Sequence, residues 1–172
     1  IILVKRGNLV VWSGNSNNGS CNGTSCPTWN SSGRYGGAYG FDGVDDYVNA
    51  TVTQTKTSHS LWIKNSTATG WSFVAYNGSA FFINGAAESP KQYPLNISGN
   101  IVNIGYNYSG NALFNGSIDA VQIYNRSLTA AEVNQLYISN LYKYNSTQWY
   151  LYVNQSKNAT AGLDQGRYTY FA

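Results

Sequence analysis

The chain has 172 residues, a formal net charge of +3 and only 10% charged residues. This length suits one domain of ordinary size with its own core and leaves room for part of a second. Apart from Lys5-Arg6 the basic residues stand singly, and no run approaches the roughly 20 apolar residues of a membrane span, so we expect neither nucleic-acid binding nor membrane insertion.

Short segments rich in Val, Ile, Tyr, Phe and Trp recur along the chain, each bounded by Gly, Asn or Ser, which predicts β-strands. In chain order they are NLVVW (8–12), GAYGF (37–41), DYVNATV (46–52), HSLWIK (59–64), WSFVAY (71–76), AFFING (80–85), NIVNIGY (100–106), ALFNGSIDAVQIY (112–124), QWYLYVN (148–154) and RYTYFA (167–172). Asn77-Gly78, Asn84-Gly85 and Asn115-Gly116 supply the positive φ that hairpin turns require. The pattern predicts an all-β, antiparallel β-sandwich.

One segment, SLTAAEVNQLYISNLY (127–142), has helical rather than strand periodicity. Thr129 and Glu132 have the spacing of a capping box, in which hydroxyl and carboxylate each satisfy a backbone donor of the first turn. The apolar positions Val133, Leu136, Tyr137 and Leu141 fall on one face. We therefore expect one short helix near 130–141 packed against the sandwich, and no catalytic role for Glu132.

The pattern Asn-x-Ser/Thr, which is the acceptor of N-linked glycans, occurs thirteen times and is spread from end to end. We expect an exported protein with covalent N-glycans at some of these positions. The asparagines are Asn18, Asn22, Asn30, Asn49, Asn65, Asn77, Asn96, Asn107, Asn115, Asn125, Asn145, Asn154 and Asn158.

Cys21 and Cys26 are the only cysteines and lie in the polar stretch CNGTSC. A zinc site would need further Cys or His nearby, and a redox pair is usually spaced Cys-x-x-Cys. We predict a disulfide that closes a small loop in an oxidising compartment, with a stabilising effect of about 2 kcal/mol.

Three blocks resemble the laminin G-like, concanavalin A-like jelly-roll module of exported proteins: SGNSNNGS (13–20), PTWNSSGRYGGAYGFDGVDDYV (27–48) and FNGSIDAVQIYNRSLTAAEVNQLY (114–137). The resemblance covers roughly residues 8 to 138. It implies two packed antiparallel sheets and extracellular recognition of glycans or proteins, or structural spacing. We expect this jelly-roll sandwich to occupy residues 1–142.

The segment 143–172 is similar to the opening strands of an immunoglobulin-like or fibronectin-like repeat that often follows such modules in archaeal surface proteins. At the other end, Trp12 almost adjoins Ser13, so the family's first strand is shortened or displaced. The tail, or IILV (1–4), could complete a sheet in the same molecule or in a neighbour. Strand pairing between neighbouring molecules would build a filament. The alternative explanation of the incomplete domains at both ends is that the chain is a piece cut from a larger protein.

The acidic residues are few, and they are Asp42, Asp45, Asp46, Glu88, Asp119, Glu132 and Asp164. No strand carries the alternating acids that a glycosidase on this fold commonly uses, and neighbours such as Asp45 and Asp46 point to opposite faces of a strand. His59, the only histidine, is interpreted as a lone surface residue, so catalytic triads and transition-metal sites lack parts. We expect no enzymatic activity.

The stretch FDGVDDYV (41–48) is interpreted as a hairpin in which Asp42-Gly43 forms the turn and the neighbouring acids bond to backbone amides. The alternative is a calcium site, because carboxylate oxygens are the ligands that Ca²⁺ prefers. Its predicted ligands are Asp45, Asp46 and Asp119, the last in GSIDAVQIY, where it also suits a turn or a buried tyrosine. No other cofactor is expected.

Five tryptophans divide by their surroundings. Trp12, Trp62 and Trp149 lie inside strand patterns and are predicted to be core residues, whereas Trp29 and Trp71 are flanked by polar residues and are candidates for stacking on sugars. The sequence thus predicts a non-enzymatic, N-glycosylated extracellular module with a structural or adhesive role, which would form a filament or sheath with copies of itself. The alternative is a carbohydrate-binding, lectin-like adhesion domain of a larger surface protein, which would recognise cell-surface glycans or proteins.

Overall fold

The computed structural model describes residues 19–35, 37–89, 93–106 and 112–139, together with the backbone of the short strands 3–5, 10–12, 141–143 and 149–151. The described elements are β1 (Leu3–Lys5), β2 (Val10–Trp12), β3 (Gly19–Ser20), the 3-10 helix η1 (Gly23–Ser25), β4 (Thr28–Asn30), β5 (Ala38–Asp42), β6 (Val48–Thr51), β7 (Ser58–Asn65), β8 (Ser72–Tyr76), β9 (Phe81–Ile83), β10 (Ala86–Glu88), β11 (Leu95–Ser98), β12 (Ile101–Ile104), β13 (Asn115–Tyr124), α1 (Ala130–Ile138), β14 (Leu141–Lys143) and β15 (Trp149–Leu151). The predicted strand 167–172 lies outside the described residues.

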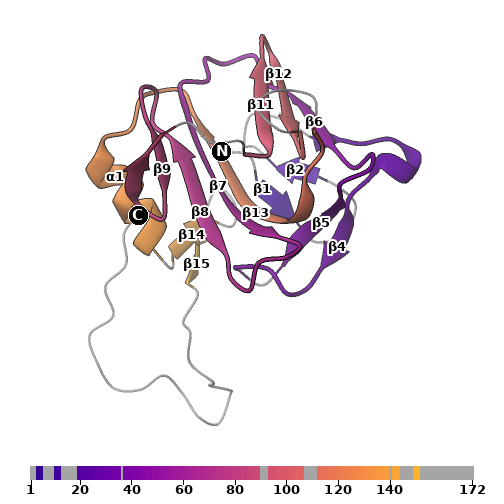
Figure 1. Cartoon of the computed structure of the whole chain (residues 1–172). Coiled ribbons are helices and arrows are strands. Elements are labelled where there is room, and N and C mark those ends of the chain that lie inside the picture. The colour runs from indigo at the N-terminus through magenta and orange to yellow at the C-terminus, as the bar shows by residue number, and fades with distance from the viewer. Residues whose placement is uncertain are drawn as a thin grey trace.

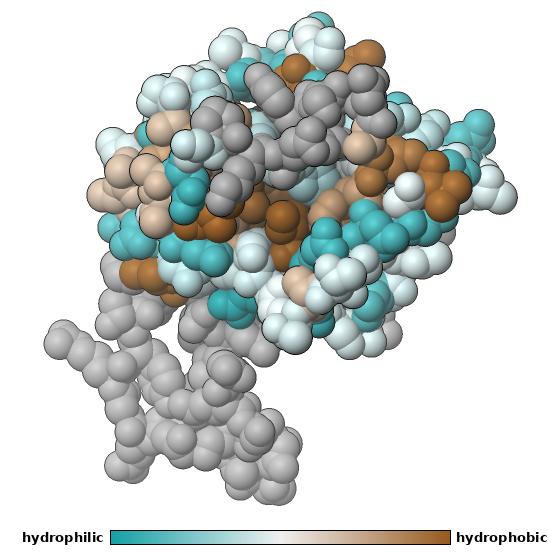
Figure 2. Space-filling model, viewed as in Figure 1, coloured by the Kyte–Doolittle hydropathy of each residue, from teal (hydrophilic) through white to brown (hydrophobic). Residues whose placement is uncertain are grey.

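Two antiparallel sheets form the sandwich (Figure 1). The larger has seven strands in the order β10-β9-β8-β7-β13-β5-β4, and the smaller has four in the order β11-β12-β6-β3. In the same view, Figure 2 shows apolar side chains gathered along the middle of the molecule, where β7, β8 and β13 lie, with hydrophilic side chains around them. The predicted all-β, antiparallel jelly-roll sandwich with one short helix is confirmed.

Strand periodicity places a core on each face of the seven-stranded sheet. Along β7, Leu61 points between the two sheets while its neighbour Trp62 points to the opposite, outer face. The core between the sheets contains Tyr39, Phe41, Val48, Ala50, Val52, Leu61, Val74, Tyr93, Leu95, Val102, Ile104, Ile118, Val121 and Ile123. A second cluster on the outer face contains Trp62, Phe73, Ala75, Phe82, Ala120, Leu128 and Val133. Because Val133 belongs to α1, the helix covers this outer face.

The helix α1 begins where the sequence predicted. The Thr129 hydroxyl accepts a hydrogen bond from the Glu132 amide (3.1 Å), and the Glu132 carboxylate accepts one from the Thr129 amide (2.8 Å), which completes the capping box. The Arg126 guanidinium pairs with Glu132 and is the main reason that the pKa of this carboxyl falls to about 2. The helix ends at Ile138, earlier than the predicted end at 141, and Leu141 opens β14 instead.

Replacing Thr129 with alanine is expected to lower the free energy of unfolding by about 1 kcal/mol, because the Glu132 amide then loses its side-chain acceptor. Thr129→Ser keeps the hydroxyl and should stay close to the wild type. Urea denaturation followed by circular dichroism measures both variants. Equal losses in the two would show that the cap is not what stabilises this end of α1.

Of the turns predicted from Asn-Gly pairs, two are confirmed and one is wrong. Asn84 (φ 50°) and Gly85 (φ 80°) connect β9 to β10, and Gly78 (φ 104°) lies between β8 and β9. Asn115-Gly116, by contrast, begins β13 rather than forming a hairpin. The hairpin predicted for FDGVDDYV is also wrong, because β5 belongs to the seven-stranded sheet and β6 to the four-stranded sheet. This turn therefore carries the chain from one layer to the other.

The terminal strands form local hairpins. β1 pairs with β2, which lies beside β3 of the smaller sheet, and β1 lies beside β13 of the larger sheet. β1 and β2 form a sheet of their own and add no strand to either sheet of the sandwich, so the completion of a sheet by IILV or by the tail stays a prediction. β14 pairs with β15. Short strands without a strong sequence signal complete the fold, namely β3, β4, β10 and β11.

Candidate functional site

An open cleft of about 480 Å³ lies on the outer side of the seven-stranded sheet, beside α1. We call it the aromatic cleft, and its lining residues are Arg34, Trp62, Trp71, Asn84, Tyr137 and Ile138. They come from the loop before β5, from β7, from the residue just before β8, from the β9–β10 turn and from α1. Of the two sugar-stacking candidates, Trp71 lines this cleft.

Aromatic rings in contact with one another form the floor of the cleft. Trp62 is 5% exposed, and its ring lies 5.4 Å from Phe73 and 5.9 Å from Tyr137, nearly parallel to the latter at 28°. The Arg34 guanidinium stands 4.6 Å from the Trp62 ring centroid, within cation–π distance. The cleft therefore presents aromatic faces next to a fixed positive charge.

Asp119 holds the loop that carries Arg34. It lies on β13 opposite Trp62, and its carboxylate accepts a hydrogen bond from the Tyr35 amide at 2.8 Å. A bulge follows at Ala120, where φ is 51°, so that both Asp119 and Ala120 face the helix side while Val121 returns to the inner core. The Tyr35 hydroxyl donates to the Ser139 carbonyl at 2.8 Å and so ties the same loop to the end of α1.

Asp119 and His59 are both buried, each 5% exposed. Burial raises the pKa of Asp119 to about 6, and it lowers the pKa of His59 to about 4. The interpretation of His59 as a surface residue is therefore wrong. Its Nε2 lies 3.0 Å from the Tyr93 hydroxyl, at a pocket of about 280 Å³ that Tyr76, Phe81 and Lys56 also line.

The two buried groups should give opposite pH dependences. The pKa of Asp119 is raised from 3.8, so its contribution to stability is complete below about pH 4 and is lost as the pH rises through 6. The pKa of His59 is lowered from 6.5, so its contribution is complete above pH 6.5 and is lost as the pH falls through 4.

Asp119→Asn should therefore lose stability more steeply than the wild type between pH 7 and pH 4, by up to about 3 kcal/mol. His59→Gln should do the reverse, because it removes the group whose protonation opposes folding. Urea denaturation at four pH values measures both slopes. Parallel pH profiles for wild type and variants would contradict the assignment.

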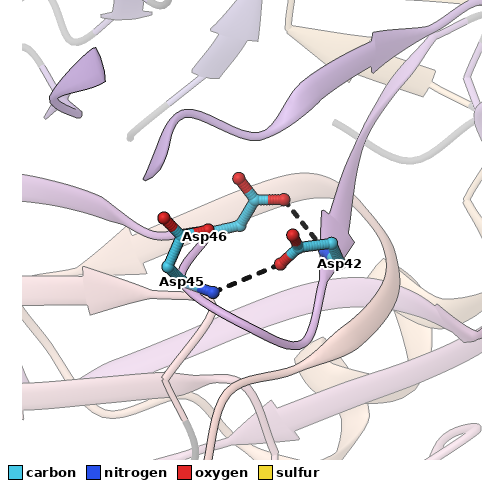
Figure 3. A group of neighbouring side chains, drawn as sticks. All are labelled: Asp42, Asp45 and Asp46. Carbon is cyan, nitrogen blue, oxygen red and sulfur yellow. Dashed lines mark hydrogen bonds between the residues drawn. The ribbon is translucent and has the colours of Figure 1, made fainter. Parts of the chain in front are cut away.

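The acidic turn gathers three carboxylates, those of Asp42, Asp45 and Asp46, with ligand atoms within 4.8 Å of one another (Figure 3). The group includes Asp42 in place of Asp119, so the predicted set is corrected at that position. Oδ1 of Asp42 accepts from the Val44 amide at 2.8 Å, and Oδ2 of Asp46 accepts from the Asp42 amide at 2.8 Å. These carboxylates therefore accept hydrogen bonds from backbone amides of the turn, as the sequence indicated.

Hydrogen bonds and burial shift the pKa values of two of these acids in opposite directions. The Val44 amide lowers the pKa of Asp42, whereas burial, together with the neighbouring carboxylates Asp42 and Asp45, raises the pKa of Asp46. The remaining oxygen of each carboxylate is suited to a hard cation. These three carboxylates supply part of the six to eight oxygen ligands that Ca²⁺ takes.

The predicted disulfide between Cys21 and Cys26 is present, and its loop packs on the acidic turn. Inside the loop, the Ser25 hydroxyl donates to Asp45 at 3.0 Å and the Ser25 carbonyl accepts from the Tyr47 amide at 3.1 Å. The disulfide therefore helps to position the Ser25 hydroxyl, which donates to Asp45.

The tryptophan predictions separate as follows. Trp29 is 37% exposed on the edge strand β4, where its ring packs edge-on against Tyr39 and lies over Gly37; it does not line the aromatic cleft. Trp62 is buried, as predicted. The side chains of Trp12 and Trp149 lie outside the described residues, although their backbones belong to β2 and β15.

Sequence reasoning did not find Arg34, Asn84, Tyr137 or Ile138 as cleft residues. They stand in three separate segments, the loop before β5, the β9–β10 turn and the end of α1, and no local pattern connects these. The cleft offers a guanidinium, an amide and aromatic faces, which are groups that bind polar, ring-shaped ligands.

Residues 70–134 match a laminin G family model described as the concanavalin A-like lectin/glucanases superfamily. Trp71, Asn84 and Asp119 lie inside the matched region. Neither a curated protein nor a solved structure matches the chain significantly. Together with the two-sheet architecture, the match supports a concanavalin A-like jelly-roll module. Within the described residues, no helix is long and apolar enough to cross a membrane.

Proposed function

From a concanavalin A-like sandwich with a disulfide, we propose a non-enzymatic, N-glycosylated extracellular module that binds cell-surface glycans through the aromatic cleft. The observation that carries the proposal is the juxtaposition of Trp71, Tyr137 and Arg34 around one cleft. The apolar face of a sugar ring stacks on aromatic side chains, and its hydroxyls accept from a guanidinium or an amide. The cleft is open enough for one or two sugar rings of a longer chain.

A glycan array probed with the labelled, purified chain tests this proposal. We expect a defined set of oligosaccharides to bind, and Trp71→Ala to weaken binding at least tenfold because the stacking face is lost. Trp29→Ala is the matched control and should bind like the wild type, since Trp29 lies outside the cleft. Equal binding by both variants, or binding of no glycan by a folded wild type, would overturn the assignment.

The acidic turn adds a calcium site to this proposal. Asp42, Asp45 and Asp46 offer three oxygens in one place, and a bound cation would offset the burial and the repulsion between carboxylates that raise the pKa of Asp46. Titration calorimetry with Ca²⁺ should show one site, and the melting temperature should fall in chelator. Asp42→Asn combined with Asp45→Asn should abolish the heat, while Glu88→Gln should not; no heat with the wild type would contradict the site.

Self-assembly into a filament is the second candidate function. The observation that favours it is the edge strand β10 of the seven-stranded sheet, whose three residues are all exposed. An exposed edge can accept a strand from a neighbouring copy. Light scattering should then show mass that grows with protein concentration, and electron microscopy should show fibres. A monodisperse monomer at high concentration would exclude this candidate.

A further inference from the structure

The structure distinguishes among the glycosylation sequons. Eight lie within the described residues: Asn22, Asn30, Asn49, Asn65, Asn77, Asn96, Asn115 and Asn125. The other five, Asn18, Asn107, Asn145, Asn154 and Asn158, lie outside them. The eight differ in how the fold uses the side-chain amide, which is the group that glycosylation modifies.

In three sequons the asparagine forms an Asx turn with its own Ser or Thr. The backbone amide two residues on donates to the asparagine oxygen, in the pairs Ser32 to Asn30 (2.8 Å), Thr67 to Asn65 (3.1 Å) and Ser79 to Asn77 (3.0 Å). In two of them the hydroxyl donates to the same oxygen, from Thr67 Oγ1 (3.1 Å) and from Ser79 Oγ (3.1 Å). All three lie at the end of a strand: Asn30 and Asn65 are the last residues of β4 and β7, and Asn77 directly follows β8.

In these Asx turns the two polar atoms of the side-chain amide have different roles: Oδ1 accepts the hydrogen bonds of the turn, and Nδ2 is the atom that glycosylation modifies. Transfer of a glycan replaces one hydrogen of Nδ2 by a bond to the anomeric carbon of a lipid-linked oligosaccharide phosphate, and the lipid phosphate leaves with the proton. The Asx turn uses only Oδ1, and the modified amide keeps that oxygen. A sugar on Nδ2 therefore costs the turn none of its hydrogen bonds.

Asn49 is the opposite case. It lies in the interior of the four-stranded sheet, on β6, with Asn103 of β12 opposite on one side and Ser20 of β3 on the other. Its Oδ1 is buried and has no hydrogen-bond partner within the described residues. A sugar on this amide would stand between Asn103 and Ser20, in the interior of the sheet rather than at the end of a strand.

We infer that Asn30, Asn65 and Asn77 are glycan attachment sites and that Asn49 is not. The inference rests on the proposed N-glycosylation and narrows it to particular turns. The folded chain accommodates sugars at ends of strands of the seven-stranded sheet and keeps the face of the four-stranded sheet around Asn49 bare.

Site occupancy in the secreted full chain tests the inference. Protein from a glycosylating eukaryotic cell line is treated with an amidase in heavy-oxygen water, which marks each formerly glycosylated asparagine, and peptides are sequenced by mass spectrometry. Most molecules should carry the mark at Asn30, Asn65 and Asn77, and none at Asn49. Marks at other sequons but not at these three, or equal occupancy at Asn49, would overturn the inference while leaving glycosylation intact. No mark anywhere would overturn the proposed glycosylation as well.

Variants that keep each asparagine provide the control. Ser32→Ala, Thr67→Ala and Ser79→Ala remove the hydroxyl that the sequon requires but keep the backbone N–H that donates to the asparagine, and each should lower the mass of the secreted protein by one glycan. Thr51→Ala removes the sequon of Asn49 in the same way and should leave the mass unchanged apart from the substitution. A glycan-sized loss in Thr51→Ala contradicts the assignment.

Discussion

Replacing Trp62 with alanine should destabilise the protein by about 3–5 kcal/mol, the range for removing a buried aromatic side chain. Trp62 packs against Phe73 and Tyr137 and underlies the Arg34 guanidinium, so its removal leaves a cavity between β7 and α1. Thermal or urea denaturation measures the loss. The aromatic cleft should lose its floor, so glycan binding should be lost even in the fraction of molecules that remains folded.

Trp29→Ala is the control for this prediction, because it removes the same side chain from an edge strand where it is 37% exposed. We expect a loss of about 1–2 kcal/mol. If both variants lost the same stability, the layer between the sheet and α1 would not be the second core that the structure indicates.

Gly105→Ala should lower the free energy of unfolding nearly as much as Trp62→Ala. Gly105 has φ of 96°, and an added Cβ would lie 2.6 Å from the Phe41 ring and 2.9 Å from the Asp46 carbonyl oxygen. Backbone strain and overpacking together should lower the free energy of unfolding by about 3–5 kcal/mol. Both contacts belong to the segment that links the two sheets, so the acidic turn should be disturbed too.

Gly99→Ala separates these two causes. Gly99 also has a positive φ, 54°, but an added Cβ there meets nothing within 4 Å. Only the backbone strain remains, and a loss of about 1 kcal/mol is expected. Similar unfolding free energies for the two variants, measured side by side in urea, would show that the contact with Phe41 is not what requires glycine at position 105.

The parts of the fold that could be predicted are those specified by neighbouring residues. The capping box of Thr129 and Glu132 is closed within one helical turn, and the Cys21–Cys26 disulfide spans five positions, so both were visible in the sequence. The alternation of β7 likewise indicated a buried Trp62. Local chemistry carries these predictions because no distant partner can change them.

The errors concern residues whose surroundings come from elsewhere in the chain. His59 was expected on the surface, but Tyr93, 34 residues later, lies against its ring. FDGVDDYV has the chemistry of a hairpin turn, yet its two flanking strands pair in different sheets. Asp119 was grouped with Asp45 and Asp46 by residue type, whereas the bulge at Ala120 directs it towards Tyr35.

The aromatic cleft was only partly predictable for the same reason. Trp71 could be singled out because polar residues surround it, but Arg34, Asn84 and Tyr137 meet it only through the order of strands in the sheet and the position of α1. A binding surface assembled from separate segments has no signature in any one of them.

The most direct test of the account follows the five tryptophan indole N–H signals by nitrogen-15 NMR while a glycan bound on the array is added. Assignment uses single tryptophan-to-phenylalanine variants. The signals of Trp71 and of Trp62, on the floor of the cleft, should shift with one saturating affinity, while that of Trp29 stays in place. Shifts confined to Trp29, or none at Trp71 at saturation, would contradict glycan binding in the aromatic cleft.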